Sequence, residues 1–196
     1  MKKKIVFFSV ITVVCMALIS SCEKENKTLT EIQPSPVVVP EIPVTIGQTY
    51  AGGIVFFVDS TGKHGLIAAR NNQSHTLPWS NGSNIITHAQ GINLGTGREN
   101  TSAIVYFQGS GSYAASICDK LMVSGYSDWY LPSKDELHLL YAAKAEGWIS
   151  AGLDNAFYWS STEASESGAW SQSFSNGANS STAKNGEYSV RAIRSF

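Results

Sequence analysis

The chain has 196 residues, and its charges nearly balance, with 14 lysines and arginines against 15 aspartates and glutamates. This balance argues against a nucleic-acid-binding protein, because such proteins typically carry a basic excess. The length fits one domain with its own core and a shorter additional segment.

The first 21 residues are typical of a lipoprotein signal peptide. Lysines at positions 2–4 precede an apolar run from Ile5 to Ile19, which is shorter than the roughly 20 residues that span a bilayer. The run ends in the letters ISSC, which resemble a bacterial lipobox with Cys22 as the acylated residue. We therefore expect cleavage after residue 21 and attachment to a membrane through a lipid on Cys22. The alternative is ordinary signal cleavage beside an incidental cysteine.

Residues 22–46 are predicted to form a tether. Four of the six prolines lie from Pro34 to Pro43, and this composition favours an extended, polyproline-like chain without a core. The letters EKEN after Cys22 partly resemble the export signal of surface lipoproteins in Bacteroidetes-type bacteria. We expect an outer-membrane lipoprotein that faces the cell exterior, with a periplasm-facing position as the alternative.

Residues 47–196 are predicted to form one loop-rich α+β domain. All 17 glycines lie there, which exceeds the usual share of about 7% and indicates many turns. β-Branched and aromatic residues at 52–59, then a turn and the apolar stretch 66–69, predict a β-hairpin. Residues 70–97 show no sustained period and predict a long loop.

Two main helices are predicted in the middle of the chain. The apolar positions of residues 114–121 share one helix face, so Cys118 is expected to be a buried side chain and, as the domain's single cysteine, to form no internal disulfide. A second helix begins at Ser133, which is predicted to form a capping box with Glu136. The pattern for a shorter helix at 99–107 is weaker.

The last third of the chain is predicted to be β-structure. Strand candidates lie at 157–163, 169–174 and 188–196, and Asn-Gly pairs between them are tight-turn signals.

The last of these strands carries an arginine on each face. Whichever face is buried brings Arg191 or Arg194 inward, and a buried guanidinium needs a carboxylate partner. Asp128 and Glu163 are the predicted partners because each lies in aromatic sequence, Asp128 directly before Trp129. We expect a structural ion-pair network in the core rather than a catalytic pair.

Five motifs in this order resemble the Lcl C-terminal domain family: YAGGIVFFVD, HGLIAA, GYSDWYLPSKDEL, YWSSTE and VRAIRSF. Together they span nearly all of residues 47–196. The resemblance implies a C-type-lectin-like fold, which is shared with formylglycine-generating enzymes. Such a fold has two helices, a long loop region and an antiparallel sheet in which the terminal strands pair.

The resemblance, the anchor and the tether together favour a non-catalytic binding module that adheres to or recognises a glycan or a protein. Trp79 and Trp170 lie in or beside Gly/Ser/Asn-rich segments and could stack on sugars, with core packing as the alternative for each. The family's named member binds sulfated polysaccharides, but this sequence shows no basic cluster that would suit a polyanion.

Two other functions are weighed against binding. An enzyme is disfavoured because the related formylglycine generators use a pair of copper-binding cysteines, and the four histidines here lack zinc-ligand spacing. The E-P-N, Q-P-D and W-N-D triplets of calcium-using lectins are also missing, so no metal or cofactor is expected. The remaining alternative is a structural or assembly subunit of a cell-surface complex, and a homo-oligomer fits either role.

Overall fold

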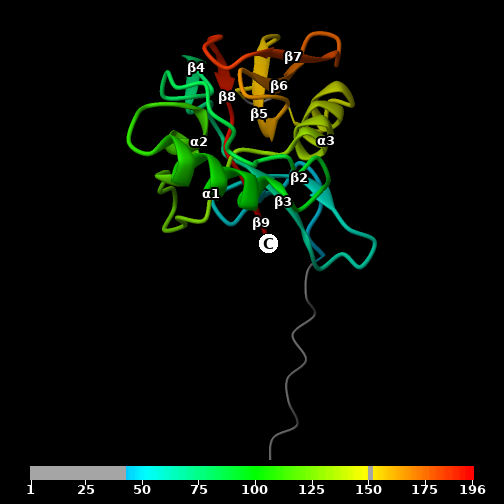
Figure 1. Cartoon of the computed structure of the whole chain (residues 1–196). Coiled ribbons are helices and arrows are strands. Elements are labelled where there is room, and N and C mark those ends of the chain that lie inside the picture. Colours follow the sequence, from blue (N-terminus) through cyan, green and yellow to red (C-terminus); the bar gives the residue numbers. More distant parts are fainter. Residues whose placement is uncertain (1–42, 150–151) are drawn as a thin grey trace, which may run out of the picture. The chain divides into compact units, whose positions relative to one another are not determined.

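The computed structural model describes residues 43–149 and 152–196, and the predicted signal peptide, Cys22 and most of the tether lie outside them. The described residues form an α+β domain with two sheets and three helices (Figure 1). Within those residues no helix is long and apolar enough to cross a membrane. Val44 packs against the core, so the folded part begins before residue 47.

The first sheet brings the two ends of the domain together. Its antiparallel strands follow the order β1 (Thr49–Tyr50), β2 (Gly53–Val58), β3 (Gly65–Ala68) and β9 (Ile193–Ser195). The β2–β3 hairpin is the predicted one. Leu66 of β3 lies between Phe57 of β2 and Ser195 of β9, so the N-terminal hairpin pairs with the last strand, as the resemblance implied.

The second sheet lies at the other end of the domain (Figure 1). Its order is β4 (Ser74–Leu77), β8 (Tyr188–Val190), β5 (Phe157–Glu163), β6 (Gly168–Ser173) and β7 (Asn179–Ala183). β5 and β8 run parallel, whereas the other neighbours are antiparallel. The expected single antiparallel sheet is therefore corrected to two sheets with one parallel pair. The predicted strand 188–196 is divided between them, because the chain leaves the second sheet after Val190 and enters the first at Ile193.

The helices are α1 (Gly97–Gln108), α2 (Ala114–Asp119) and α3 (Lys134–Ala145). The two long helices are α1 and α3. The helix at 99–107, for which the sequence pattern was weak, is therefore longer than predicted, and the helix predicted at 114–121 is shorter. The reason is that the buried face of α1 carries the polar residues Asn100, Thr101 and Gln108, which interrupt its apolar period. Asn100 and Thr101 hydrogen-bond to the backbone of Gly91 and Leu131, which satisfies them inside the core.

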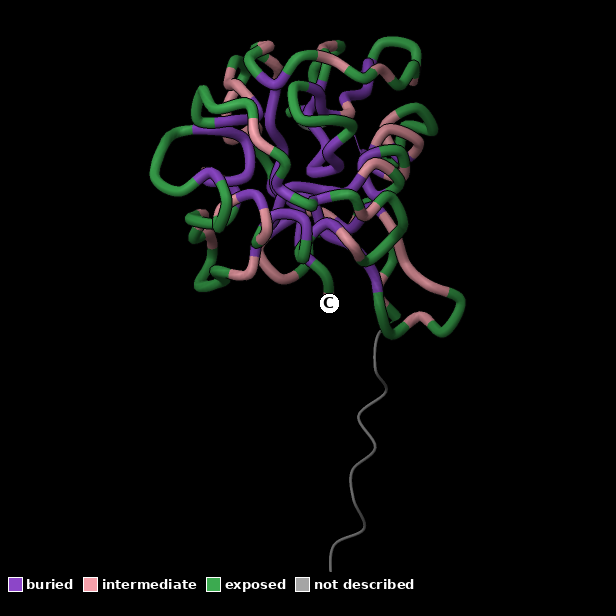
Figure 2. Tube along the Cα trace, in the orientation of Figure 1, coloured by how far each residue is buried: buried purple, intermediate pink, exposed green. Residues whose placement is uncertain are grey.

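The segment 70–97, predicted as a loop, is ordered by tertiary contacts. It contains β4, and Trp79, Thr87 and Ala89 within it are completely buried. Figure 2 shows buried backbone running through the middle of the domain and exposed backbone at its loops. One core cluster contains Trp79, Trp129 and Trp159, and a second, with Leu137, Leu140, Tyr158 and Phe174, lies between α3 and the strands.

Candidate functional site

The structure pairs Asp128 with Arg194, as predicted. Asp128 Oδ1 lies 2.7 Å from Arg194 Nε, and Asp128 Oδ2 lies 3.0 Å from Arg194 Nη2. The Arg194 side chain is almost buried and stacks on the ring of Tyr126, but Asp128 remains 38% exposed and also approaches Arg98 at 3.5 Å. The hydrogen bond from Arg194 holds the pKa of Asp128 below its usual value. The pair is therefore at the edge of the core rather than inside it.

Glu163 pairs with Lys184 and not with an arginine. The distance from Lys184 Nζ to Glu163 Oε1 is 2.6 Å, and both side chains are sealed from solvent. Glu163 also accepts hydrogen bonds from the amides of Thr87 and His88, while Lys184 donates to the carbonyl of Ile85. This partner could not be predicted from the sequence, because Lys184 stands directly before the Asn185-Gly186 turn, and turns usually lie at the surface.

Among the residues that the structure describes, Arg191 is buried and has no carboxylate partner, which corrects the predicted network. Its guanidinium donates to the carbonyl oxygens of Ala69 and Gly152 and to the side-chain oxygen of Asn72. Burial lowers the pKa of Arg191 to about 10. Trp129 is buried, and its indole N–H donates to the carbonyl of Tyr126 at 3.1 Å. Asp128, Trp129 and Arg194 thus form one cluster, from which Glu163 and Arg191 are separate.

The two tryptophans proposed as sugar-stacking residues differ in accessibility. Trp79 is completely buried and donates its indole N–H to the carbonyl of Ser160 at 2.8 Å, so it is a core residue and cannot contact a ligand. Trp170 is half-buried, and the ammonium of Lys134 lies 3.7 Å from the centre of its ring. The most exposed tryptophan is Trp148, at 54%, which sequence reasoning did not select.

Helix α3 begins in the predicted capping box. The Ser133 hydroxyl accepts a hydrogen bond from the Glu136 amide at 3.3 Å, and Glu136 Oε2 accepts one from the Ser133 amide at 2.8 Å. Glu136 Oε1 also accepts from the Gly95 amide at 2.9 Å. Burial raises the pKa of Glu136, against the opposing effect of these hydrogen bonds. The cap therefore joins α3 to the loop before α1, and that loop borders a groove.

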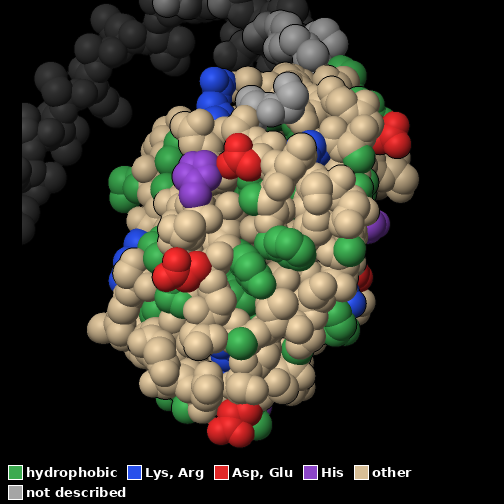
Figure 3. All heavy atoms as spheres, turned by 90° about the horizontal axis from the view of Figure 1, so that it is seen from above, with side chains coloured by type: hydrophobic (Ala, Val, Ile, Leu, Met, Phe, Trp, Pro, Cys, Tyr) green, Lys and Arg blue, Asp and Glu red, His purple; other side chains and the backbone are tan. Residues whose placement is uncertain are grey.

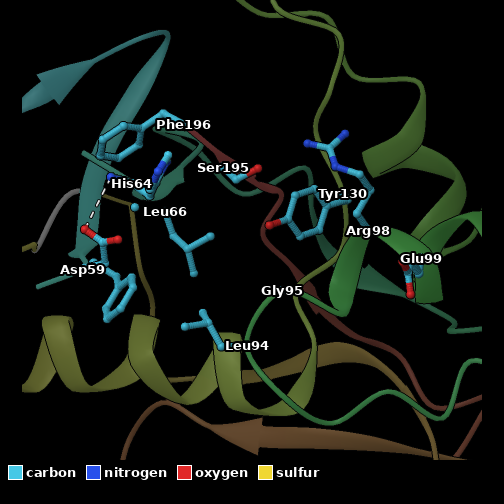
Figure 4. A pocket seen from close by; sticks show the side chains of 12 residues that line it. Asp59, His64, Leu66, Leu94, Gly95, Arg98, Glu99, Tyr130, Ser195 and Phe196 are labelled. Carbon is cyan, nitrogen blue, oxygen red and sulfur yellow. Dashed lines mark hydrogen bonds between the residues drawn. The ribbon is translucent and has the colours of Figure 1, made fainter. Parts of the chain in front are cut away.

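The groove lies between the β2–β3 hairpin, the start of α1 and the C-terminal residues, and has a volume of about 450 Å³ (Figure 4). Leu66, Leu94 and the ring of Tyr130 point into it, and Phe57 completes this apolar floor. Leu66 and Tyr130 are almost fully buried, whereas Leu94 is 46% exposed. A volume of this size falls within the usual range for ligand pockets, about 300–1,000 Å³.

Charged groups of both signs form the rim of the groove. Asp59 caps the hairpin turn by accepting hydrogen bonds from Thr61 and from the backbone N–H of His64, and the hydroxyl of Thr61 lowers the pKa of Asp59. On the opposite side, the Arg98 guanidinium lies over the Tyr130 ring at 4.8 Å. Both charges are held in place by neighbours, and the apolar floor lies between them.

Two further polar contacts lie at the groove. His64 approaches Asp59 through its backbone N–H, not its imidazole, and the Tyr130 hydroxyl lies 3.4 Å from Glu136 Oε1. The one thiol in the described part of the chain, Cys118, is fully buried, and its pKa is raised by that burial. Residues 43–149 and 152–196 contain no group of three or more His, Cys, Asp or Glu side chains that could hold a metal.

Sequence reasoning missed the groove because its lining comes from four separated segments. The hairpin, residues 94–99, Tyr130 and the last two residues meet only in the folded chain. The turn of the hairpin and the Tyr-Leu-Pro of the third motif predicted only local structure. No spacing within one segment could have indicated that they face each other.

Comparisons with known proteins support the fold. The sequence model of the Lcl C-terminal domain family matches residues 68–194. The crystal structure of a fimbrial protein from Bacteroides ovatus is similar, with a TM-score of 0.51 and 16% identity over 72% of this chain. The match covers 43% of that protein, so this chain spans less than half of its length. No curated protein matches the sequence.

Proposed function

Because the chain belongs to the Lcl C-terminal domain family, we propose that it is a non-catalytic recognition module of the bacterial cell surface that binds its ligand in the groove. The observation that supports this proposal most strongly is the groove itself, which combines an apolar floor with fixed charges of both signs. A floor of this kind removes apolar surface of a ligand from water, and the charged rim selects its orientation.

The opposite charges on the rim of the groove indicate which ligands would fit there. Asp59 and Arg98 stand on opposite sides, so a polyanion such as a sulfated glycan would meet repulsion at one of them. An apolar side chain of a protein, or the apolar face of a sugar, would fit against Leu66 and Leu94. The proposed ligand is therefore a protein or a weakly charged glycan.

Display at the surface is part of the proposal. Lipidation of Cys22 would attach the chain to the outer membrane, with the predicted tether of residues 22–46 between the lipid and the domain. The first described residues and the C-terminus lie at one end of the domain (Figure 1).

The proposal is tested by screening the purified protein on arrays of glycans and of peptides, at low and at physiological salt. The variant Leu94→Asp places a charge in the floor of the groove. Ile92→Asp is the matched control, since Ile92 is 44% exposed in the same loop but does not line the groove. We expect salt-tolerant binding by the wild type and by Ile92→Asp, and a loss of at least about tenfold in Leu94→Asp, as for a burial worth about 1.4 kcal/mol. If the wild type binds nothing on the arrays, or if both variants bind equally well, the proposal is contradicted.

An assembly role is the second candidate, and one strand favours it. β7 pairs with β6 on one side, and residues 179–183 carry no charge or proline that would protect the other edge. Such an edge can accept a strand from another chain. Assembly would be favoured over recognition by two results together. The wild type would bind nothing on the arrays but elute as an oligomer in size-exclusion chromatography, and the Ser181→Pro variant would elute as a monomer.

A further inference from the structure

Apart from the groove, the second sheet presents a pair of aromatic rings at one end. Phe157 and Tyr188 are the first residues of the neighbouring parallel strands β5 and β8, so both lie at the same end of the sheet. Their ring centres are 5.4 Å apart, with the planes inclined by 31°. Phe157 is 42% exposed and Tyr188 is half-buried. Seen from above, the domain shows apolar side chains in the middle of its surface, with acidic and histidine side chains beside them (Figure 3).

The rings are held in place from below. Tyr188 packs on the completely buried Trp159, with 4.6 Å between ring centres. Trp159 is fixed in turn by a hydrogen bond of 2.9 Å from its indole N–H to the carbonyl of Leu77 in β4. Because the rings are already ordered, a ligand that stacks on them does not have to immobilise them.

A carboxylate held by hydrogen bonds lies close to Phe157 in the sequence. Asp154 precedes Phe157 by three residues and is about half exposed. Its Oδ2 accepts a hydrogen bond from Asn72 Nδ2 at 3.0 Å and lies 3.0 Å from His75 Nδ1, while its amide donates to the Tyr158 hydroxyl. The carboxylate is therefore held in one orientation and still reaches solvent.

We propose that this aromatic face is a second binding site, independent of the groove, and that it takes an uncharged saccharide. The C–H groups on one face of a pyranose ring are apolar and weakly positive, and they pack against the electron-rich faces of Phe157 and Tyr188. The sugar hydroxyls donate to Asp154, which supplies the polar contact that fixes orientation.

Charge and size distinguish this ligand from the alternatives. Glu187 directly precedes Tyr188 and is exposed, and Asp154 lies three residues before Phe157, so both ring-bearing segments carry negative charge, which disfavours sulfated or acidic glycans. The Lys144 ammonium is engaged by the side chain of Asn155 and the carbonyl of Phe174. Two rings also present far less surface than the roughly 800 Å² that each partner contributes to a stable protein interface.

The test uses the purified full-length protein and β-linked tetrasaccharides of glucose, xylose, mannose and N-acetylglucosamine, with a heparin tetrasaccharide as the anionic probe. Affinity is measured by calorimetry for the wild type and for Phe157→Ala and Asp154→Asn. Tyr106→Ala is the matched control, because Tyr106 is an 81% exposed aromatic residue on α1. Thermal unfolding of each variant confirms that it is folded.

We expect at least one neutral tetrasaccharide to bind the wild type, with the affinity reduced at least tenfold in Phe157→Ala, reduced in Asp154→Asn, and unchanged in Tyr106→Ala. A panel in which no neutral sugar binds, or in which only the heparin probe binds, overturns the inference. So does binding that Phe157→Ala and Asp154→Asn both retain. Neutral-sugar binding that is lost in Leu94→Asp but kept in Phe157→Ala assigns the sugar to the groove and refutes the second site alone.

Discussion

Lys184 and Glu163 form an ion pair from which solvent is excluded, and each charge depends on the other. The carboxylate is satisfied by Lys184 and by the amides of Thr87 and His88, and the ammonium also contacts the Trp79 ring at 4.7 Å. Since the pair and its hydrogen bonds compensate the cost of burial, removing one partner leaves an uncompensated charge in the core.

We therefore expect Lys184→Met to lower the free energy of unfolding by about 3–5 kcal/mol, because it leaves the Glu163 carboxylate unpaired. Urea unfolding measures the change. Lys63→Met, at an exposed position in the hairpin turn, is the control and should remain within about 0.5 kcal/mol of the wild type. A Lys184→Met protein as stable as the wild type would show that the pair is not a structural requirement.

The Asp128–Arg194 pair should contribute less and should depend on pH. Because Asp128 is partly exposed, we expect Asp128→Asn to cost about 1–2 kcal/mol at neutral pH rather than the cost of a buried pair. The pKa of Asp128 is lowered in the folded protein, so its contribution is complete above the unfolded-state pKa of about 3.9 and is lost as the pH falls below it. The measurement is urea unfolding of both proteins from about pH 7 to about pH 2. A difference in stability that stays constant over this range would contradict the assignment.

At the scale of elements, the start of α3 depends on one side chain with two roles. Ser133 Oγ accepts from the Glu136 amide and donates to the carbonyl of Asn93 at 2.9 Å, so it caps α3 and holds the loop before α1. Loss of both bonds should place Ser133→Ala toward the upper end of the usual range for N-caps.

We expect Ser133→Ala to reduce the free energy of unfolding by about 1–2 kcal/mol, measured from the midpoint of urea unfolding. Ser102→Ala is the control, since Ser102 is an exposed residue inside α1, where alanine is the better helix former. Its stability should equal or slightly exceed that of the wild type. Equal midpoints for Ser133→Ala and the wild type would mean that the cap is dispensable.

Elements with local signals were predictable, and those defined by distant partners were not. The β2–β3 hairpin and α3 have turn residues, apolar patterns and a capping box within their own sequence. β4 has two exposed and two half-buried residues and is a strand because it pairs with β8, more than a hundred positions later. For the same reason, the charge of Lys184 could be seen in the sequence but its burial beside Glu163 could not.

At the scale of the whole molecule, the fold separates two surfaces suited to binding. The groove borders the first sheet beside the C-terminal residues, and the aromatic pair lies at an end of the second sheet. The family resemblance anticipated the α+β class and the pairing of the hairpin with the last strand. It did not indicate the two surfaces proposed for binding, because the motifs contain groove residues such as Leu66 and Tyr130 but do not show that these residues face each other.

The central claim is that the groove is the contact surface of a recognition module. It is tested most directly by titrating the isotope-labelled protein with the strongest ligand from the glycan and peptide arrays, while following its amide resonances by NMR. The account predicts that the largest shifts fall on Leu66, Leu94 and Tyr130, and that the amide of the exposed Trp148, outside the groove, is unaffected. Shifts that spare those three residues and map elsewhere on the domain would contradict it.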